Sequence, residues 1–240
     1  MSTPLVRAVI TVRAMPARAV VITAMASVTA LAFGSARAWP AWALAGATLA
    51  PWLPVFTLGT ARTYRNDGYL ALFYVLAVTQ TAHWLEHVAQ VSQLHLLDKT
   101  GPAARGIFGA LDIEWVHFTW NAIVFVAALV LLQRFRQNAW LWVLAGIATW
   151  HIAEHSFMIM EYLRQGKPGH PGFLSKGGIL GGGLPLVRPD LHFFYNLIET
   201  VPLVGGLFWQ LRRSSLVRSR CGEGFKPGAL ATDGGPATGS

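Results

Sequence analysis

Charged side chains and cysteine are both scarce in this chain. Asp, Glu, Lys and Arg make up only 12% of its 240 residues, whereas a soluble globular domain carries about 25%. The single cysteine, Cys221, excludes an internal disulfide framework and any cysteine-rich zinc or iron–sulfur site. A metal ion bound by this protein would therefore need histidine, carboxylate or amide ligands.

Apolar residues are abundant instead, at 53% of the sequence, and the mean hydropathy is +0.43. The net charge of +8 would suit a nucleic-acid partner. However, the basic residues cluster in short segments between apolar runs, which is typical of the loop charges that set membrane topology. We therefore predict an all-α polytopic integral membrane protein, in a bacterial-type plasma membrane, with no nucleic-acid partner.

Six segments are candidates for membrane-spanning helices, each of which needs about 20 mostly apolar residues. They are residues 18–35, 41–58, 68–97, 111–135, 139–162 and 190–211. Pro51 and Pro54 are expected to kink the second segment. The first segment has a competing interpretation as a signal peptide cleaved after "ARA" at 36–38, although its long N-terminal region favours a retained helix. More Lys and Arg flank the helices on the side of the termini, so both termini are predicted to be cytoplasmic.

Three short motifs occur twice in the same order. "TAHWLEH" at 81–87 matches "TWHIAEH" at 149–155, "GIFG" at 106–109 matches "GILG" at 178–181, and "HFTWN" at 117–121 matches "HFFYN" at 192–196. This order predicts a tandem duplication of a helix–loop–helix unit, whose two copies cross the membrane in the same direction. The predicted parts are an N-terminal helix pair (1–66), two repeats (67–137 and 138–213) and a cytoplasmic tail (214–240). The tail is rich in Gly, Pro, Ala and Thr from residue 222 onward, which favours disorder.

The repeated motifs place polar side chains on four of the predicted helices. At about 100° per residue, the two histidines and the glutamate of each HxxEH motif lie on one stripe. The rise of about 1.5 Å per residue brings all six histidines to one layer in the outer half of the membrane. The predicted metal ligands are His83, His87, His117, His151, His155, His192, Asn121 and Asn196, and the predicted catalytic carboxylates are Glu86 and Glu154.

Two histidines at i and i+4 on a helix are well placed to bind one metal ion. The neighbouring glutamates would bridge two ions, orient an imidazole or carry a proton. Glu199, one turn beyond Asn196, is a candidate for supporting the site or for a proton path. The alternative is a structural polar network that joins the helices. Soluble inverted-zincin proteases use HxxEH once, with a distal carboxylate, so the duplicated motif disfavours that class.

This ligand set predicts a metal-dependent oxidoreductase, hydroxylase-like or oxidase-like, whose substrate is a membrane lipid or another hydrophobic small molecule. Imidazole ligands favour copper or iron and also accept zinc, and an oxidase would need an external electron donor. In ligand type only, the site resembles the histidine-box membrane hydroxylases and desaturases, which hold two irons. Those proteins differ because they carry HxxHH boxes and more histidines, and their sites face the cytoplasm.

Two other function classes stay open from the sequence. One is a copper or zinc carrier or sensor, although the cytoplasmic half has no comparable histidine layer. The other is a bis-histidine b-type haem protein that transfers electrons, for which the paired histidines and the intervening glutamate are superfluous. The sequence does not fix the oligomeric state.

Overall fold

The computed structural model describes residues 17–99, 103–109 and 113–223, and these form seven α-helices and no strand. The all-α prediction is therefore confirmed. The predicted leader residues 1–16 and tail residues 224–240 lie outside the described residues. The helices are α2 (Ala17–Ala36), α3 (Ala41–Leu49), α4 (Trp52–Asn66), α5 (Gly68–His95), α6 (Glu114–Arg134), α7 (Ala139–Gln165) and α8 (Arg188–Glu223).

Five of the predicted segments correspond to single helices, and the second is broken. Pro51 precedes α4 as its N-cap residue, and α3 and α4 meet at a bend of 48°. Proline has no N–H to donate to the preceding turn, which explains why the helix breaks here. At the other end, α8 continues to Glu223, so residues 214–223 of the predicted tail are helical.

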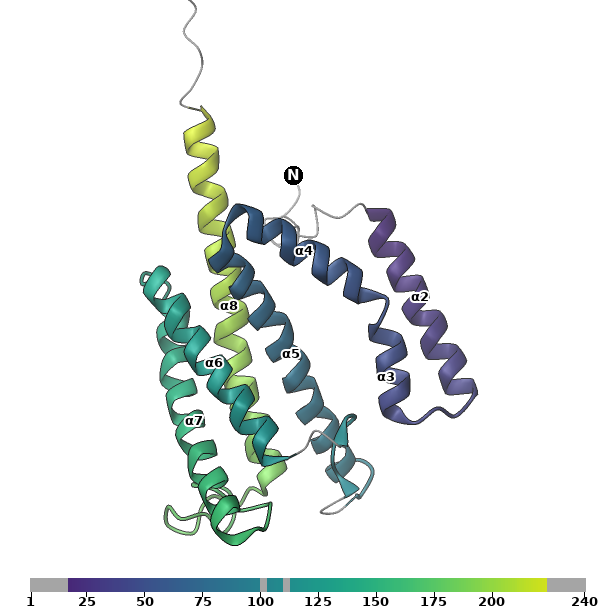
Figure 1. Cartoon of the computed structure of the whole chain (residues 1–240), viewed down its shortest axis with the longest axis vertical. Helices are drawn as coiled ribbons and strands as arrows, with labels where there is room; N and C mark the ends of the chain where they lie inside the picture. Colours follow the sequence, from purple (N-terminus) through teal and green to yellow (C-terminus); the bar gives the residue numbers. More distant parts are fainter. Residues whose placement is uncertain (1–16, 100–102, 110–112, 224–240) are drawn as a thin grey trace, which may run out of the picture.

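Helices α5 to α8 form a bundle, in which α5 packs on α8, α6 packs on α7, and α7 packs on α8 (Figure 1). Asp67 fixes the start of α5, because its carboxylate accepts hydrogen bonds from the backbone N–H groups of Tyr69 and Leu70. Gly166 ends α7 in a left-handed conformation with φ of +67°. Helices α5 and α7 run in one direction, and α6 and α8 run in the other (Figure 1). The hairpin of α2 and α3 lies beside this bundle, to which α4 connects it.

The interior of the bundle is apolar at one end and polar at the other. Phe73, Leu131, Leu141, Leu144 and Leu203 are fully buried near the starts of α5 and α7. The second halves of the same two helices instead bury histidine, glutamine and glutamate side chains. Burial of polar groups is costly unless they are paired, so this end of the bundle is where a functional site is expected.

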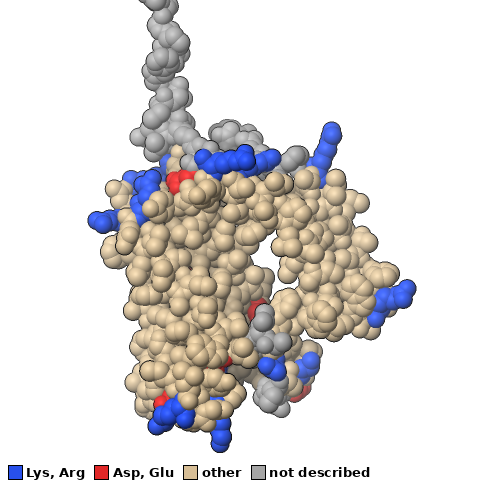
Figure 2. Space-filling view, in the orientation of Figure 1, with Lys and Arg blue, Asp and Glu red and all other residues tan. Residues whose placement is uncertain are grey.

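Three described helices are long and apolar enough to cross a membrane, namely α2, α6 and the Arg188–Ser214 part of α8. The bent pair of α3 and α4 makes a fourth if it counts as one span. On the face shown in Figure 2, Lys and Arg gather at the two ends of the molecule and leave an uncharged band between them. Helices α5 and α7 are not among the three, because the polar residues of the histidine motifs lower their hydropathy. The six-span topology therefore stays a prediction.

Candidate metal centre

The first group of possible ligands comes from α5 and α6. One nitrogen each of His83, His87 and His117 lies within 4.8 Å of the other two, and the Nε2 atoms of His83 and His87 are 3.3 Å apart. Two imidazoles on one tetrahedral ion, with bonds of about 2.0–2.1 Å, place their nitrogens about 3.3 Å apart. This group could therefore hold a metal ion, whose identity the geometry does not determine.

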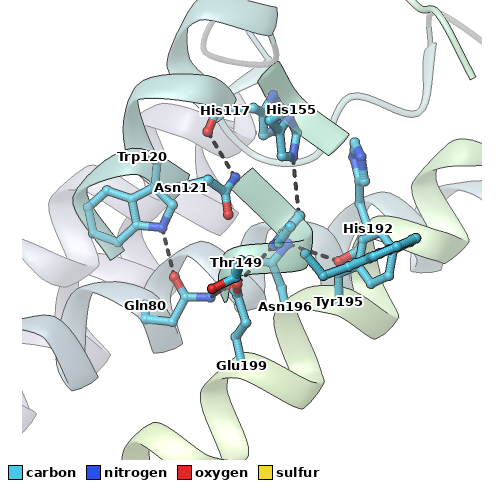
Figure 3. Close-up of polar contacts among 12 residues, drawn as sticks. Gln80, His117, Trp120, Asn121, Thr149, His155, His192, Tyr195, Asn196 and Glu199 are labelled. Carbon is cyan, nitrogen blue, oxygen red and sulfur yellow. Dashed lines mark hydrogen bonds and ion pairs between the residues drawn. The ribbon is translucent and has the colours of Figure 1, made fainter. Parts of the chain in front are cut away.

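The other three histidines come from α7 and α8. The Nε2 atoms of His151 and His155 are 3.1 Å apart, and the His192 ring centroid lies 5.1 Å from that of His155. The two groups touch, since the His117 ring stacks on His155 at 5.8 Å with an interplanar angle of 10° (Figure 3). The structure thus brings all six predicted histidines into one continuous cluster.

Two of these histidines place Nδ1 against an oxygen atom that accepts hydrogen bonds. A ring in this arrangement carries its hydrogen on Nδ1 and keeps a lone pair on Nε2. Histidines that bind metals are commonly oriented in this way by a partner behind the ring. The contacts are His87 with Gln90 Oε1 at 2.7 Å and His117 with the Ile113 carbonyl at 3.2 Å. His151 Nδ1 lies 3.0 Å from Glu199 Oε1, but the two atoms do not form a hydrogen bond.

Gln80 connects three helices immediately beside the histidines. Its Nε2 donates to Asn196 Oδ1 at 2.9 Å and to Glu199 Oε2 at 3.3 Å, and its Oε1 accepts a hydrogen bond from Trp120 Nε1 at 2.7 Å (Figure 3). Gln80 is completely buried. Sequence reasoning missed this residue, although its position one turn before His83 was a signal that it lies near the same face.

The two predicted asparagine ligands share one contact and differ in another. Asn121 and Asn196 each donate Nδ2 to the carbonyl of the histidine four residues earlier, at 2.9 Å. The Asn196 Oδ1 is occupied by Gln80, whereas the Asn121 Oδ1 is buried and has no hydrogen-bond partner among the described residues. Of the two carbonyl oxygens, that of Asn121 is the one still available to a ligand.

The predicted catalytic carboxylates contact the loops that follow α5 and α7. Each accepts a backbone hydrogen bond through Oε1, and next to each carboxylate lies a glycine with positive φ. The Phe108 N–H donates to Glu86 at 2.7 Å, and Gly106 (φ +78°) lies beside this carboxylate. The Phe173 N–H donates to Glu154 at 2.8 Å, and Gly172 (φ +74°) lies beside that one. A Cβ at these glycines would lie 2.3 Å and 2.4 Å from the carboxylate oxygen. The two glutamates therefore anchor loops, a role that the motif did not predict.

This pairing also corrects the sequence match between the loops. The match placed Gly106 opposite Gly178, but Gly172 is the residue that packs against Glu154 as Gly106 packs against Glu86. Gly178 instead lies close to the backbone of Phe173 and Ser175. The loops differ in length, so a comparison of the short motifs alone selected the wrong glycine.

An ion pair joins the starts of α6 and α8 next to the cluster. Both guanidinium nitrogens of Arg188 bind the Glu114 carboxylate, at 2.6 Å and 2.8 Å, and the Gly169 N–H donates to the same carboxylate at 3.1 Å. Glu114 is three residues from His117, and Arg188 is four residues from His192. The pair thus fixes the two helix ends that carry these histidines.

No protein-family model matches this chain, and neither the curated proteins nor the solved structures contain a significant match to it.

Proposed function

We propose that this chain is an integral membrane metalloenzyme whose metal centre lies inside the α5–α8 bundle. One observation carries the proposal. Six buried or half-buried imidazoles from four helices meet in one cluster, and two of them direct Nδ1 at a protein oxygen, so that Nε2 carries the lone pair. The Nε2 atoms of His83 and His87, and those of His151 and His155, face one another at 3.3 Å and 3.1 Å. This is the separation expected for two ligands of one ion.

We place the centre in the outer half of a six-span protein with cytoplasmic termini. Helices α5 and α7 have 28 and 27 residues. At about 1.5 Å per residue either is long enough to cross a bilayer core of about 30 Å. Their polar residues are buried in the bundle, which is where polar groups of membrane helices are tolerated. The positive charges that flank the helices support the orientation.

We further propose that the two helix pairs, α5–α6 and α7–α8, arose by duplication. Each pair has two facing Nε2 atoms one turn apart, a glutamate that accepts a loop N–H, and an asparagine that donates to a histidine carbonyl. These matching contacts support the repeat more directly than the short sequence matches do.

The proposed reaction is hydroxylation of a hydrophobic or lipid-like molecule that reaches the centre from the bilayer, with dioxygen as the oxidant. One oxygen atom would enter the product and the other would leave as water, and an external donor would supply the two electrons that this requires. Copper or iron would supply the redox chemistry, and imidazole ligands suit both. Neighbouring ring centroids are only 4.8–6.2 Å apart, a spacing that suits bare ions rather than a haem between the rings. A carrier or sensor of copper or zinc is the second candidate, because the same ligands would bind those ions.

The test is elemental analysis, with absorption and electron paramagnetic resonance spectra, of the full-length protein purified in detergent. We expect a stoichiometric metal that is lost in the His87→Ala/His117→Ala variant. His95→Ala is the matched control, because His95 is exposed and pairs with Asp190 outside the cluster. Equal metal content in the cluster variant and the control would refute the metal centre. A protein that binds only zinc and stays redox-silent would refute the oxidoreductase and favour the carrier.

A further inference from the structure

We infer that the six histidines form two separate metal positions, one in each helix pair. This inference rests on the proposed metal centre and specifies its composition. The first position consists of His83, His87 and His117, and the second consists of His151, His155 and His192.

The two positions have similar ring spacings, but among the described residues only the first brings three ring nitrogens within 4.8 Å of one another. In the second, His151 and His155 provide the close pair of nitrogens, and His192 is the neighbouring ring. In the first, the ring centroids are 4.8 Å, 5.6 Å and 5.7 Å apart. In the second, they are 4.8 Å, 5.1 Å and 6.2 Å apart. Each position also contains one pair of facing Nε2 atoms at the separation expected for two ligands of one ion.

The His151–His155 pair points to a cation in the second position. The Nε2 atoms of His151 and His155 face each other at 3.1 Å, and both rings are buried. Their Nδ1 atoms have no hydrogen-bond partner among the described residues, although Glu199 Oε1 lies 3.0 Å from Nδ1 of His151. No described protein group therefore fixes a hydrogen on either Nδ1 or on either of the facing Nε2 atoms. An ion bound between the two Nε2 atoms would use both of their lone pairs.

Glu199 supplies a second and independent reason. It is completely buried, and its described partners are His151 and Gln80, neither of which carries a fixed positive charge. A buried carboxylate needs a compensating charge. A divalent ion on the far side of the His151 ring would provide it, in the carboxylate–histidine–metal arrangement that is common in metal sites. The first position has the neutral Gln90 in the corresponding role behind His87.

The two ions would be neighbours in one cluster. His117 of the first position stacks on His155 of the second at 5.8 Å, and His87 lies 5.8 Å from His192. These contacts between the positions are almost as close as those within them. The result is a two-metal centre whose halves differ in the charge behind one ligand.

The experiment loads the full-length protein in detergent with Zn²⁺ alone, removes loosely bound ions by dialysis against a weak chelator, and measures zinc per chain. We expect two ions in the wild type and in His95→Ala, and one ion in both His83→Ala/His87→Ala and His151→Ala/His155→Ala. The corresponding His→Gln pairs replace any alanine variant that does not elute as a folded species in gel filtration.

The possible results separate this inference from the proposed function. One ion in the wild type, lost completely in either pair variant, would overturn the two-position inference and leave the metal centre intact. One ion lost in only one of the pair variants would also overturn it. No zinc in the wild type, with no other metal after purification, would overturn both.

Discussion

The helix pairs α5–α6 and α7–α8 hold their histidines with the same contacts but support them differently. In both, Nε2 atoms one turn apart face each other, at 3.3 Å in the first pair and 3.1 Å in the second. In both, a glutamate accepts a loop N–H and an asparagine donates to the carbonyl of a histidine. The two pairs therefore use the same contacts to position their histidines and to attach the loop that follows.

The contacts that are not shared lie behind the histidines. The first pair has Gln90 behind His87 and leaves the Asn121 carbonyl oxygen available. The second has Glu199 behind His151, and its Asn196 carbonyl oxygen is occupied by Gln80. The comparison teaches that one backbone arrangement can place a neutral amide or a carboxylate next to its histidines. The variants below test which contacts hold the pairs together and which distinguish them.

The largest effect is expected from breaking the ion pair that joins the two helix pairs. In Arg188→Met, the Glu114 carboxylate, with a side chain only 3% exposed, loses its guanidinium partner. Removal of one partner of a buried pair costs about 3 kcal/mol or more, so we expect a decrease of that size in the free energy of unfolding in detergent. Arg164→Met is the control, because the Arg164–Glu161 pair lies on the surface with Arg164 72% exposed and should contribute under about 1 kcal/mol. Equal losses in both variants would contradict the role of the Arg188 pair.

The next largest effect is expected at the glycines beside Glu86 and Glu154, and it tests whether the two glutamates attach their loops equally. Gly106→Ala and Gly172→Ala each force a Cβ against a glutamate oxygen at a positive φ. Each should lower the free energy of unfolding by about 2 kcal/mol. Gly146→Ala, within α7 where nothing lies within 4 Å of an added Cβ, should be neutral or stabilising by up to about 1 kcal/mol. A large loss at only one loop glycine would show that the anchors are not equivalent.

The carboxylate behind His151 should distinguish the metal positions. With the first position removed by His83→Ala/His87→Ala, Glu199→Gln should weaken zinc binding at the second by about tenfold or more, as expected for a partner behind a ligand. A competition titration against a coloured chelator measures the affinity. In the His151→Ala/His155→Ala background, the same Glu199→Gln change should leave zinc affinity at the first position unchanged. Equal weakening in both backgrounds would show that Glu199 acts on the whole cluster.

Replacing the asparagines should have a smaller effect on zinc affinity, and this effect should fall on the first position rather than on the second. Asn121→Ala removes the available carbonyl oxygen, so zinc affinity at the first position should fall a few-fold. Asn196→Ala removes an oxygen that Gln80 already occupies, so zinc affinity at the second position should not change. The same competition titration in the two pair-variant backgrounds measures both. A larger loss of affinity from Asn196→Ala would reverse the assignment.

Much of the architecture could be predicted from the sequence, because long apolar runs determine where the helices lie. The meeting of six histidines also followed from helical periodicity, since residues at i and i+4 share a face and the motif recurs. The supporting residues could not be predicted in this way. Gln80 contacts Asn196 across 116 residues of sequence, and such a contact depends on how α5 packs on α8. A single glutamine in the sequence does not indicate which other helix its side chain will contact.

The loop contacts of Glu86 and Glu154 have a geometric reason that the sequence contained. On a helix with about 100° per residue, Glu86 is about 60° from His83 and about 100° from His87. It therefore lies at the edge of the stripe rather than at its centre. From that edge, the carboxylate reaches the loop backbone at Phe108.

The smallest effect is expected from replacing these two carboxylates by amides. Glu86→Gln and Glu154→Gln keep an oxygen that can accept the loop N–H, so each should cost about 0.5–1 kcal/mol in the free energy of unfolding and leave zinc stoichiometry unchanged. Glu→Ala at the same positions removes the acceptor and should cost about 1–3 kcal/mol, because the loop N–H is left unsatisfied. Loss of zinc in the glutamine variants with unchanged stability would instead make the glutamates metal ligands. Loss of zinc in only one of the two glutamine variants would add a third difference between the helix pairs.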